Sequence, residues 1–429
     1  MHLPEAVKKA LDMLHDAGYA AYAVGGCVRD AVMGIAPHDF DLASSATPQE
    51  MLHVFKGHRL IETGLKHGTV TVLMDGMPLE ITTFRSANGA YAHTLEEDLL
   101  HRDLTMNAMA YHPGEGVIDP FGGQKDIQNG VIRCVDNAES RILEDPLRML
   151  RAARFASVFG FKVDQDTQRA IDRNREKLGE VSVERLASEL IRLLCGRDVR
   201  RVLMEQVCLL GVFLPELLPM EGFDQRNHHH LYTVLEHTAI AVENIPPVPV
   251  LRLAMLMHDI GKPPCFRIHE DGEGHFYGHA ARSTEMADSI LERLKMDNAT
   301  RERAVLLVKY HDHVIEPDAK AVKRMLSKLG EEAFDQLLLV KRADNLAQHP
   351  DYRGRLRGLD ELARIKAEII AQSQCFSLKD LAVNGRDLMA LGMKPGPQIG
   401  QMLQKMLDAV IAGDVENDRE ALKNYGSLL

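Results

Sequence analysis

The sequence predicts an α+β protein in which a small mixed α/β head is followed by a mostly helical body. Short runs with the alternation of a β-strand, such as Thr-Val-Thr-Val-Leu at residues 69–73, are mixed with helical stretches up to about residue 135. Helical periodicity then dominates to the end of the chain. The residues are 45% hydrophobic but only 5% aromatic, without tryptophan, which favours aliphatic packing between helices.

The length of the chain predicts several domains. A chain of 429 residues exceeds what a single hydrophobic core usually supports, so we expect about two to four domains. The change of pattern divides the chain into a head (1–137), a helical neck (138–225), a third helical domain (226–350) and a helical tail (351–429). Residues 215–224 contain proline and glycine and are the expected linker.

The most informative motif lies between Val24 and Asp41. Gly25 and Gly26 predict a turn from a strand into a helix, and Asp39 and Asp41 follow on the expected next strand. Side chains two positions apart on a strand share one face, so both carboxylates can bind one metal site beside the backbone N–H groups of the glycines. This arrangement predicts a site for nucleotidyl transfer.

The chemistry of nucleotidyl transfer explains these residue types. Attack of a hydroxyl group on a nucleoside triphosphate uses Mg²⁺, often as two ions about 3.5–4 Å apart, and carboxylates bridge such ions. Arg29, one helical turn after the glycines, is placed to neutralise the triphosphate. Glu80, in a later β-rich run, is a candidate third carboxylate. Each motif alone is more often a solvated loop, so the prediction depends on the context.

Two further motifs supply that context. Their charged and polar residues are Arg102, Asp103 and Asn107 in one and Glu144, Asp145 and Arg148 in the other. We expect one helix that carries Glu144, Arg148, Arg151 and Arg154 along one arc. The alternative is an ordinary surface helix with an ion pair between Glu144 and Arg148.

In this order the motifs closely resemble those of the class II, bacterial branch of tRNA nucleotidyltransferases, the CCA-adding enzymes, and of the related poly(A) polymerases. The resemblance implies a head of the polymerase β type and two aspartates that bind Mg²⁺, Asp39 and Asp41, with Glu80 as the candidate third catalytic carboxylate. The implied nucleotide-binding residues are Gly25, Gly26, Arg29, Arg102, Asp103, Asn107, Asp145, Arg148, Arg151 and Arg154.

The family's template is a pair of side chains, here Asp145 and Arg148. A carboxylate accepts from an exocyclic amine and a guanidinium donates to ring nitrogens or carbonyls, so this pair can read cytosine and adenine. Uracil and guanine present a carbonyl where the amine is required. The resulting mismatch costs about 1–3 kcal/mol, as for an unmade buried hydrogen bond.

The sequence departs from the family pattern at two places. The family usually has two arginines before the aspartate of the second motif, and here His101 precedes Arg102. The segment 84–99 is shorter than its usual counterpart, a basic loop that helps the pocket change from CTP to ATP. A shortened loop is typical of the branch that adds only the two cytidines, so that activity stays open beside full CCA addition.

A second constellation occurs in the third domain. His237, the pair His258-Asp259 and Asp344 follow an order that resembles the HD phosphohydrolase superfamily, with a nitrogen and oxygen set suited to a transition metal or Mg²⁺. Spare ligands for a second metal are His279, His311 and Asp312. Neighbouring Lys262 can bind phosphate. Isolated histidines are more often structural, so hydrolysis of phosphoesters stays open.

Charge and cysteine content bear on the RNA-binding surface and on the cellular compartment of the protein. With a net charge of −11, any RNA-binding face must be locally basic. The six cysteines form no Cys-x-x-Cys pair, and no secretory signal or membrane-length apolar run begins the chain, so we expect reduced, mostly buried thiols in a cytoplasmic protein. Three consecutive histidines at 228–230 cannot all face one ion, so we expect a surface turn.

The tail joins a Gly- and Pro-rich connector at 394–400 to an apolar stripe between Ile399 and Ile411, which we expect to be core. The resemblance implies that this tail contacts tRNA. The sequence therefore predicts a template-independent enzyme that adds CCA, or its CC portion, to tRNA from CTP and ATP with release of pyrophosphate. The alternatives are a poly(A) polymerase and an HD metal phosphohydrolase that uses the head to bind RNA. No membrane contact or protein partner is indicated.

Overall fold

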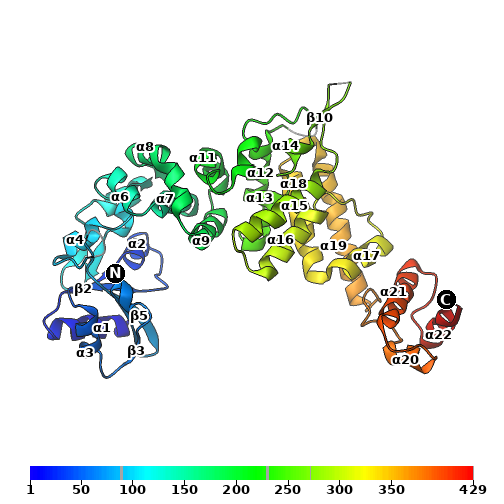
Figure 1. Cartoon of the computed structure of the whole chain (residues 1–429), viewed down its shortest axis with the longest axis horizontal. Helices are drawn as coiled ribbons and strands as arrows, with labels where there is room; N and C mark the ends of the chain where they lie inside the picture. The colour runs from blue at the N-terminus through cyan, green and yellow to red at the C-terminus, as the bar shows by residue number, and fades with distance from the viewer. Residues whose placement is uncertain (87–89, 229–230, 271, 429) are drawn as a thin grey trace. The chain divides into compact units, whose positions relative to one another are not determined.

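The structure is a computed structural model and describes residues 1–86, 90–228, 231–270 and 272–428 (Figure 1). The chain forms two compact units, Met1–Pro215 and Glu216–Leu429. The predicted α+β class is confirmed, because a seven-stranded sheet occupies the head and helices make up most of the remaining chain.

A mixed sheet lies at the centre of the head. Its strands are β1 (Ala21–Val24), β2 (Asp41–Ser44), β3 (Arg59–Ile61), β4 (Thr69–Met74), β5 (Met77–Thr83), β6 (Ala110–His112) and β7 (Gly116–Ile118). Their order is β3-β4-β5-β2-β1-β6-β7; β2 and β5 run parallel, and the other neighbours run antiparallel. The predicted alternation at residues 69–73 is confirmed in β4, where Val70 and Val72 are buried. Asp75 and Gly76, both with positive φ, form the tight turn into β5.

Short helices cover the sheet of the head. They are α1 (Glu5–Asp16), α2 (Gly26–Val32), α3 (Pro48–Val54), α4 (Leu95–Leu100) and α5 (Gly123–Asn129), with 3₁₀ turns η1 (Leu65–His67) and η3 (Thr105–Asn107). Leu11 of α1, Val28 of α2 and Met51 of α3 pack in one apolar core with Leu42 of β2 and Ile81 of β5. This core positions the ends of β1 and β2, where the first motif lies.

Helices follow the head within the same unit. They are α6 (Ala138–Glu144), α7 (Leu147–Phe159), α8 (Gln165–Asn174), α9 (Val183–Leu194), α10 (Val199–Glu205) and α11 (Val207–Leu210), with η4 (Arg175–Glu180) and the short strands β8 (Val131–Ile132) and β9 (Lys162–Val163). The prediction of one helix running on from Glu144 was wrong. Asp145 is extended (φ −147°, ψ 100°), because the proline that follows it disfavours the helical conformation, and α7 starts afresh at Leu147.

The second unit consists almost entirely of helices in the described parts of the chain. It begins in the 3₁₀ turn η5 (Pro215–Met220), which lies in the expected linker. Its helices are α12 (Val234–Asn244), α13 (Pro249–Met257), α14 (Lys262–Cys265), α15 (His279–Arg293), α16 (Asn298–Tyr310), α17 (Ala319–Leu329), α18 (Glu331–Leu346) and α19 (Arg355–Ala371), with η6 (Pro350–Gly354) and a hairpin of β10 (Arg267–Ile268) and β11 (Gly274–His275). Thr233 caps α12, and α12 packs against α13 and α18, which brings the second constellation together.

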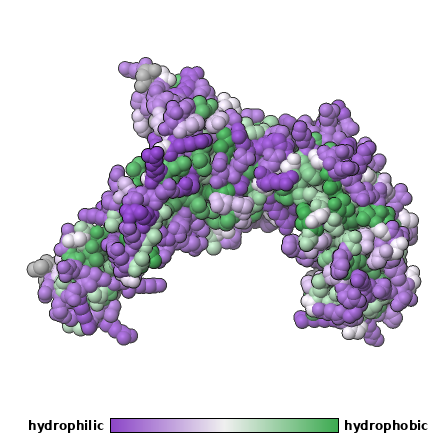
Figure 2. All heavy atoms as spheres, turned by 180° about the vertical axis from the view of Figure 1, so that it is seen from behind, coloured by the Kyte–Doolittle hydropathy of each residue, from purple (hydrophilic) through white to green (hydrophobic). Residues whose placement is uncertain are grey.

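The tail has a small core of its own. Its helices are α20 (Gly385–Ala390), α21 (Pro397–Ala412) and α22 (Arg419–Leu428). The apolar stripe of α21 packs with Leu388 and Leu422, and Met406 and Leu407 are buried there, so the expectation that the stripe is core is confirmed. Figure 2 shows hydrophilic residues over much of the visible face and smaller hydrophobic areas between them.

Two expectations about cysteines and membranes can be compared with the structure. All six cysteines lie in the described chain and none forms a disulfide. Cys27, Cys134 and Cys375 are buried whereas Cys208 is exposed, so burial holds for only half of them. In the described parts of the chain, no helix combines the length and the apolar character that a membrane crossing requires.

Candidate active site and metal centre

The two glycines of the first motif form the predicted turn between strand and helix. Gly25 caps α2 with a φ of +73°, a conformation that side-chain-bearing residues rarely adopt. A Cβ atom at Gly25 would lie 3.1 Å from Nη1 of Arg102. The glycine thus allows the guanidinium of the second motif to approach the backbone of the first.

Three carboxylates gather beside this turn. Asp41 is the first residue of β2 and pairs with Glu80 of β5 in the parallel register, which puts both side chains on one face of the sheet. The sequence predicted Asp39 on the strand, but Asp39 lies in the irregular segment that precedes β2. Desolvation by the surrounding atoms, then repulsion from Glu80 and Asp39, raises the pKa of Asp41 although the residue is exposed, while Arg102 and Arg85 oppose the rise.

The carboxylate chemistry of these three donors suits a divalent cation. Carboxylate oxygens are the ligands that Mg²⁺ prefers. A bound cation would also relieve the repulsion that Asp41 experiences from Glu80 and Asp39. Asp41 begins β2 and Glu80 lies on the neighbouring strand β5, so both face the region where the sequence predicts nucleotidyl transfer.

A chain of polar contacts connects the first two motifs. Arg29 donates from Nη1 to Oδ1 of Asn107 (2.8 Å), and Asn107 donates from Nδ2 to Oδ1 of Asp103 (3.1 Å). Asp103 is buried; burial alone would raise the pKa of its carboxyl group, but Arg151 and Asn107 hold it below the usual range. Arg29 also lies over the ring of Phe155, with 5.1 Å between the guanidinium carbon and the ring centre.

The third motif places Asp145 and Arg148 on either side of the break between α6 and α7. Arg148 donates from Nη1 to Oε2 of Glu144 (2.9 Å) and from Nη2 to the backbone carbonyl of His101 (2.7 Å). The ion pair expected between Glu144 and Arg148 is therefore present, although it joins two helices. Asp145 accepts from Nη2 of Arg185 on α9 (2.7 Å).

The two other arginines of α7 face inward. Arg151 donates from Nε to Oδ2 of Asp103 (2.7 Å), and its Nη1 lies 3.7 Å from Oε1 of Glu189 on α9. Arg154 is buried with its Nε 3.0 Å from Oε2 of the same glutamate. Burial lowers the pKa of Arg154 to about 10 against the opposing pull of Glu189. Arg154 is thus mainly part of the helix packing, whereas Arg151 reaches the pocket.

The second and third motifs line one cavity of about 260 Å³. Its lining residues are Arg85, Asp98, His101, Arg102, Asp103, Asp145, Arg148, Arg151 and Arg185. The five arginines make the cavity suited to a polyanion such as a nucleoside triphosphate. Asp98 orients two arginines that line the cavity. Its side chain accepts from Nε of Arg102 (3.1 Å) and from the backbone N–H of Arg85 (2.9 Å).

Sequence reasoning missed Arg85, Asp98, Arg185 and Glu189. Arg185 and Glu189 lie one turn apart on α9 and so share a face, which was the available signal. Arg85 lies two residues after the end of β5, and its backbone N–H reaches the side chain of Asp98 on α4. No spacing rule connects it to the pocket before the chain is folded.

The two departures from the family pattern also have a place in the structure. His101 lies in the cavity wall, where its Nδ1 accepts from Nη1 of Arg141 (2.8 Å). Within the segment 84–99, Ala92 donates its backbone N–H to the carbonyl of Phe84 (2.8 Å), and α4 begins at Leu95. Residues 87–89 of this segment lie outside the described residues.

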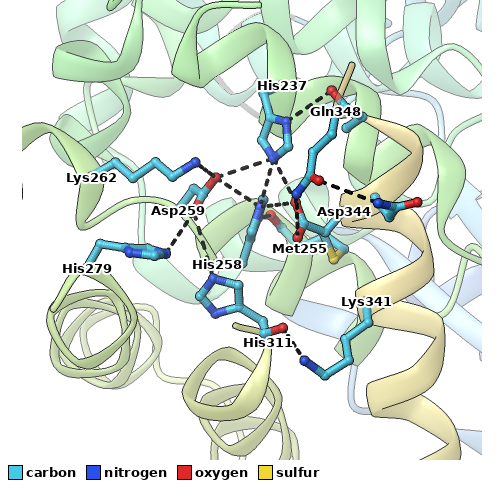
Figure 3. A network of polar contacts seen from close by, with 12 residues as sticks. His237, Met255, His258, Asp259, Lys262, His279, His311, Lys341, Asp344 and Gln348 are labelled. Atoms are coloured by element: carbon cyan, nitrogen blue, oxygen red, sulfur yellow. Dashed lines mark hydrogen bonds and ion pairs between the residues drawn. The ribbon is translucent and has the colours of Figure 1, made fainter. Parts of the chain in front are cut away.

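The second constellation converges in the second unit (Figure 3). His237 comes from α12, His258 and Asp259 follow α13, and Asp344 comes from α18. Nε2 of His237 lies 3.0 Å from Oδ1 of Asp344 and 3.3 Å from Nε2 of His258. These three residues form a group whose ligand atoms lie within 4.8 Å of one another. All four predicted residues are brought together.

A second group shares the same centre. Oδ1 of Asp259 lies 3.5 Å from Nε2 of His279 and 3.8 Å from Nε2 of His311, whereas its Oδ2 lies 3.2 Å from Nε2 of His258. The carboxylate of Asp259 thus stands between the two groups. Asp312, a predicted spare ligand, belongs to neither group, although it lines the adjoining cavity of about 380 Å³.

The backbone orients all four histidines in the same way. Nδ1 of His258 and of His311 contacts the carbonyl of the residue three positions earlier at 2.7 Å, and Nδ1 of His279 contacts the carbonyl of Phe276 at 2.9 Å. Nδ1 of His237 lies 3.2 Å from the carbonyl of Ala347. Each Nε2 therefore faces the centre, and histidines that bind a metal ion are usually oriented by such a contact of the other ring nitrogen.

Charges around this centre are tightly balanced. Burial alone would lower the pKa of His258, but Asp259 and Asp344 raise it to about 10. Burial and then His258 lower the pKa of His311 to about 3. Lys262 is buried and donates to Oδ2 of Asp259 (2.7 Å) and to Gln225 (2.9 Å), so its ammonium group faces the cluster and not the solvent.

Of the three consecutive histidines at 228–230, His228 contacts Glu273 at the surface, and residues 229–230 lie outside the described chain.

Three family models match successive parts of the chain. The model of the poly A polymerase head domain matches residues 21–133, and that of the probable RNA and SrmB-binding site of polymerase A matches residues 160–220. The model of the putative tRNA nucleotidyltransferase domain 2 matches residues 276–425. The first match contains the carboxylates of β2 and β5.

Whole proteins are similar over nearly the full length. The CCA-adding enzyme of Ligilactobacillus salivarius is 32% identical over 437 residues, which cover 98% of this chain and 96% of that protein. That of Lactobacillus delbrueckii subsp. bulgaricus is 32% identical over 429 residues, covering 97% and 95%. The crystal structure of the Bacillus stearothermophilus CCA-adding enzyme in complex with CTP has a TM-score of 0.74 and 29% identity, and covers 100% of this chain and 98% of that one.

Identity over almost all of the chain agrees with the convergence of the motifs on one arginine-lined cavity beside three carboxylates. It also agrees with the order of the matched domains. The chain therefore belongs to the class II CCA-adding enzyme family, a family of metal-dependent nucleotidyltransferases.

Proposed function

We propose that this protein adds the 3′-terminal CCA to tRNA from CTP and ATP, with release of pyrophosphate and without a nucleic-acid template. One observation carries the proposal: Asp39, Asp41 and Glu80 gather at the end of the sheet in the same unit as a cavity lined by five arginines. Similarity to CCA-adding enzymes over nearly the whole chain supports the choice of tRNA as the acceptor.

The proposed reaction joins the 3′-hydroxyl group of the RNA to the α-phosphorus of the incoming nucleotide. The bond between the α-phosphorus and the bridging oxygen breaks, and pyrophosphate leaves. Asp39 and Asp41 would hold Mg²⁺, with Glu80 as the third carboxylate beside them. When bound, Mg²⁺ activates the attacking hydroxyl group and screens the charge on the leaving pyrophosphate.

The chain's own residues bind and orient the nucleotide. Gly25, Gly26 and Arg29 would contact the triphosphate, since the glycines leave the backbone open to phosphate oxygens. Contacts to the nucleotide and its ribose are assigned to Arg102, Asp103, Asn107 and Arg151, while buried Arg154 would support this wall from behind through its ion pair with Glu189. Asp103 reaches Arg151 and Asn107 at once, so it aligns the groups of this wall.

Asp145 and Arg148 would choose the base. The carboxylate of Asp145 accepts from the exocyclic amine of cytosine or adenine, and Arg148 donates to a ring nitrogen or carbonyl. Both side chains line the cavity. A uracil or guanine would put a carbonyl against the carboxylate and leave it without a donor.

The four-part division of the chain remains part of the proposal. The head (1–137) would carry the chemistry, the neck (138–225) the base selection, and the tail (351–429) a contact to tRNA. The third domain (226–350) contains the histidine cluster. A protein that acts on tRNA with free nucleotides works where both are found, so we assign it to the cytoplasm.

Extension of tRNA at single-nucleotide resolution tests the proposal. The purified full chain is incubated with Mg²⁺ and a tRNA transcript that ends before CCA, with CTP alone, ATP alone or both. We expect two cytidines with CTP alone and one further adenosine with both. Asp41→Asn should abolish extension, whereas Asp75→Asn in the exposed turn between β4 and β5 should not.

The other outcomes of this assay are equally informative. A stop after two cytidines in the presence of both nucleotides would identify an enzyme that adds only CC. Long adenosine tails on RNA without a tRNA fold would identify a poly(A) polymerase. Absence of any extension would overturn the proposed transfer reaction.

The histidine cluster supports a second candidate function, hydrolysis of a phosphoester by an HD-type metal centre. The supporting observation is the orientation of His237, His258, His279 and His311, each with Nδ1 on a backbone carbonyl and Nε2 facing the carboxylates. Mixed nitrogen and oxygen ligands suit a transition metal more than Mg²⁺. Asp259 and Asp344 complete the donor set.

Metal titration and a chromogenic diester test this second function. Binding of Ni²⁺, Co²⁺ or Mn²⁺ to the full chain is measured by calorimetry, and hydrolysis of bis(p-nitrophenyl) phosphate is followed with each metal. His258→Ala should remove metal binding and hydrolysis, whereas His269→Ala on the β10–β11 hairpin should remove neither. A protein that binds no metal would show that the cluster is structural.

A further inference from the structure

We infer that Arg185 is a positioning residue that keeps the carboxylate of Asp145 apart from the guanidinium of Arg148, so that both stay available to a nucleobase. The inference rests on the proposed role of Asp145 and Arg148 in base selection. It adds a specificity-determining residue from α9, an element that the motifs of the head do not include.

The contact of Arg185 with Asp145 is direct. Nη2 of Arg185 donates to Oδ2 of Asp145 at 2.7 Å, while Oδ1 of the same carboxylate accepts the backbone N–H of Leu147 at 3.2 Å. Both oxygens are thus oriented by groups on opposite sides. A carboxylate has about four acceptor positions, so Asp145 can keep these two contacts and still accept from an exocyclic amine.

Arg148 is held away from Asp145 in a matching way. Its Nη1 donates to Glu144 (2.9 Å) and to the carbonyl of Arg141 (3.0 Å), and its Nη2 donates to the carbonyl of His101 (2.7 Å). The backbone N–H of Arg148 donates to the carbonyl of Asp145 (3.0 Å), but in the described part of the chain no hydrogen bond or ion pair joins the carboxylate of Asp145 to the guanidinium of Arg148. Two opposite charges three residues apart would otherwise satisfy each other, and a closed pair would offer a base nothing to bind.

A second contact holds α9 where Arg185 can act. Glu189, one turn after Arg185, lies 3.0 Å from Nε of Arg154 and 3.7 Å from Nη1 of Arg151 on α7. Unlike this buried pair, the side chain of Arg185 is 52% exposed and lines the cavity beside Asp145 and Arg148. An exposed ion pair contributes little to stability, so the place of Arg185 is better explained by the pocket than by the fold.

Nucleotide selectivity of Arg185→Ala tests the inference. Rates of single-nucleotide incorporation are measured on tRNA transcripts with CTP and, separately, with UTP. We expect KM for CTP to rise and the CTP-to-UTP ratio of kcat/KM to fall about tenfold, as for the loss of one charge-assisted hydrogen bond. Arg185→Lys should recover most of the ratio. Arg169→Ala, which removes an exposed arginine paired with Asp166 on α8, is the matched control and should leave both values unchanged.

A double-mutant cycle separates positioning from a merely structural role. If Arg185 acts through Asp145, then Arg185→Ala should not change the CTP-to-UTP ratio further in an Asp145→Ala background. Equal losses with CTP and UTP, or an unchanged ratio in the single variant, would overturn the inference while the transfer reaction stands. If the unmodified protein does not extend tRNA at all, the proposed function itself fails.

Discussion

Asp41 of β2 lies opposite Glu80 of β5 in the parallel pairing of these strands. Paired residues of neighbouring parallel strands point to the same face, so the register puts two carboxylates side by side at the end of the sheet. Asp39, two residues before Asp41, adds a third negative charge. This concentration of like charge is unfavourable for the folded chain alone and favourable for binding a cation.

Replacement of Asp41 by asparagine should increase thermal stability in the absence of metal. The pKa of Asp41 is raised in the folded chain above the ordinary value of 3.8, so the native state binds this proton more tightly than the unfolded state does. Stability then falls as pH rises through the folded pKa, and the ionised group costs stability at pH 7. We expect Asp41→Asn to unfold at a higher temperature than the unmodified protein at pH 7 with EDTA.

The same measurement at low pH provides the check on this explanation. Below the unfolded pKa the carboxyl group is protonated in both states, so the advantage of Asp41→Asn should disappear. Asp75→Asn removes a carboxylate that pairs with Lys9 at the surface, and it should not raise the unfolding temperature. A lower unfolding temperature of Asp41→Asn at pH 7 would contradict the prediction.

Mg²⁺ should stabilise the unmodified protein against heat but not Asp41→Asn. A ligand that binds the folded state alone raises stability by about 2.7 kcal/mol at one hundred times its dissociation constant. The carboxylates of Asp41 and Glu80 supply the binding charge, and we expect Glu80→Gln to show a smaller shift than the unmodified protein. Differential scanning fluorimetry at increasing Mg²⁺ concentration measures this. Equal shifts in the protein and in Asp41→Asn would place the cation elsewhere.

Asp145→Ala should remove the preference for CTP over UTP. Without the carboxylate, the amine of cytosine loses its acceptor, and the carbonyl of uracil no longer faces another acceptor. The binding free energies of the two nucleotides should therefore differ by about 1–3 kcal/mol less than in the unmodified protein. Steady-state incorporation with each nucleotide measures the ratio. Asp172→Ala, on the exposed face of α8, is the control. Discrimination that survives in Asp145→Ala would assign base selection to another residue.

Gly196→Ala should weaken both the fold and nucleotide binding. A Cβ atom at Gly196 would lie 2.6 Å from the carbonyl carbon of Ser157 and 2.1 Å from its Oγ, so α7 and the end of α9 must separate. Overpacking of this kind costs about 1–3 kcal/mol. Because Asp145 and Arg185 meet across these helices, we expect a raised KM for CTP as well as a lower unfolding temperature.

Gly179→Ala is the matched control for this prediction. Its added Cβ atom would meet nothing closer than Cγ1 of Val212 at 4.0 Å, so neither stability nor KM should fall. Thermal unfolding and CTP titration of both variants give the comparison. Similar behaviour of the two alanine variants would show that the close approach at Gly196 is relieved locally.

Local patterns in the sequence predicted the elements that depend on neighbours in the chain. The alternation at residues 69–73 became β4, the glycine pair became the turn before α2, and the stripe of α21 became core. The continuous helix expected from Glu144 was wrong, because helical periodicity continues through Asp145 while Pro146 excludes its helical conformation. The steric effect of Pro146 on Asp145 thus ends the helix even though the pattern of apolar residues continues.

Distances along the chain limited what could be predicted about the sites. The four residues His237, His258, Asp259 and Asp344 were found because their order carries a pattern, and the structure brings them together. Their orientation could not be found in the same way, since it depends on backbone carbonyls such as those of Met255 and Ala347. The position of Asp259 between two groups of ligands likewise appears only once α15 and α16 are packed beside it.

The sequence by itself determined the fold class, the order of the motifs and the identity of most chemically active residues, because these depend on residue type and on spacing of a few positions. Only the tertiary structure decided which charged side chains lie next to each other. Asp41 and Glu80 are neighbours on adjacent strands, and Arg185 of α9 forms an ion pair with Asp145, which precedes α7. Such pairs are separated by about 40 residues in the chain. Their contact is produced by sheet register and helix packing, which no local pattern encodes.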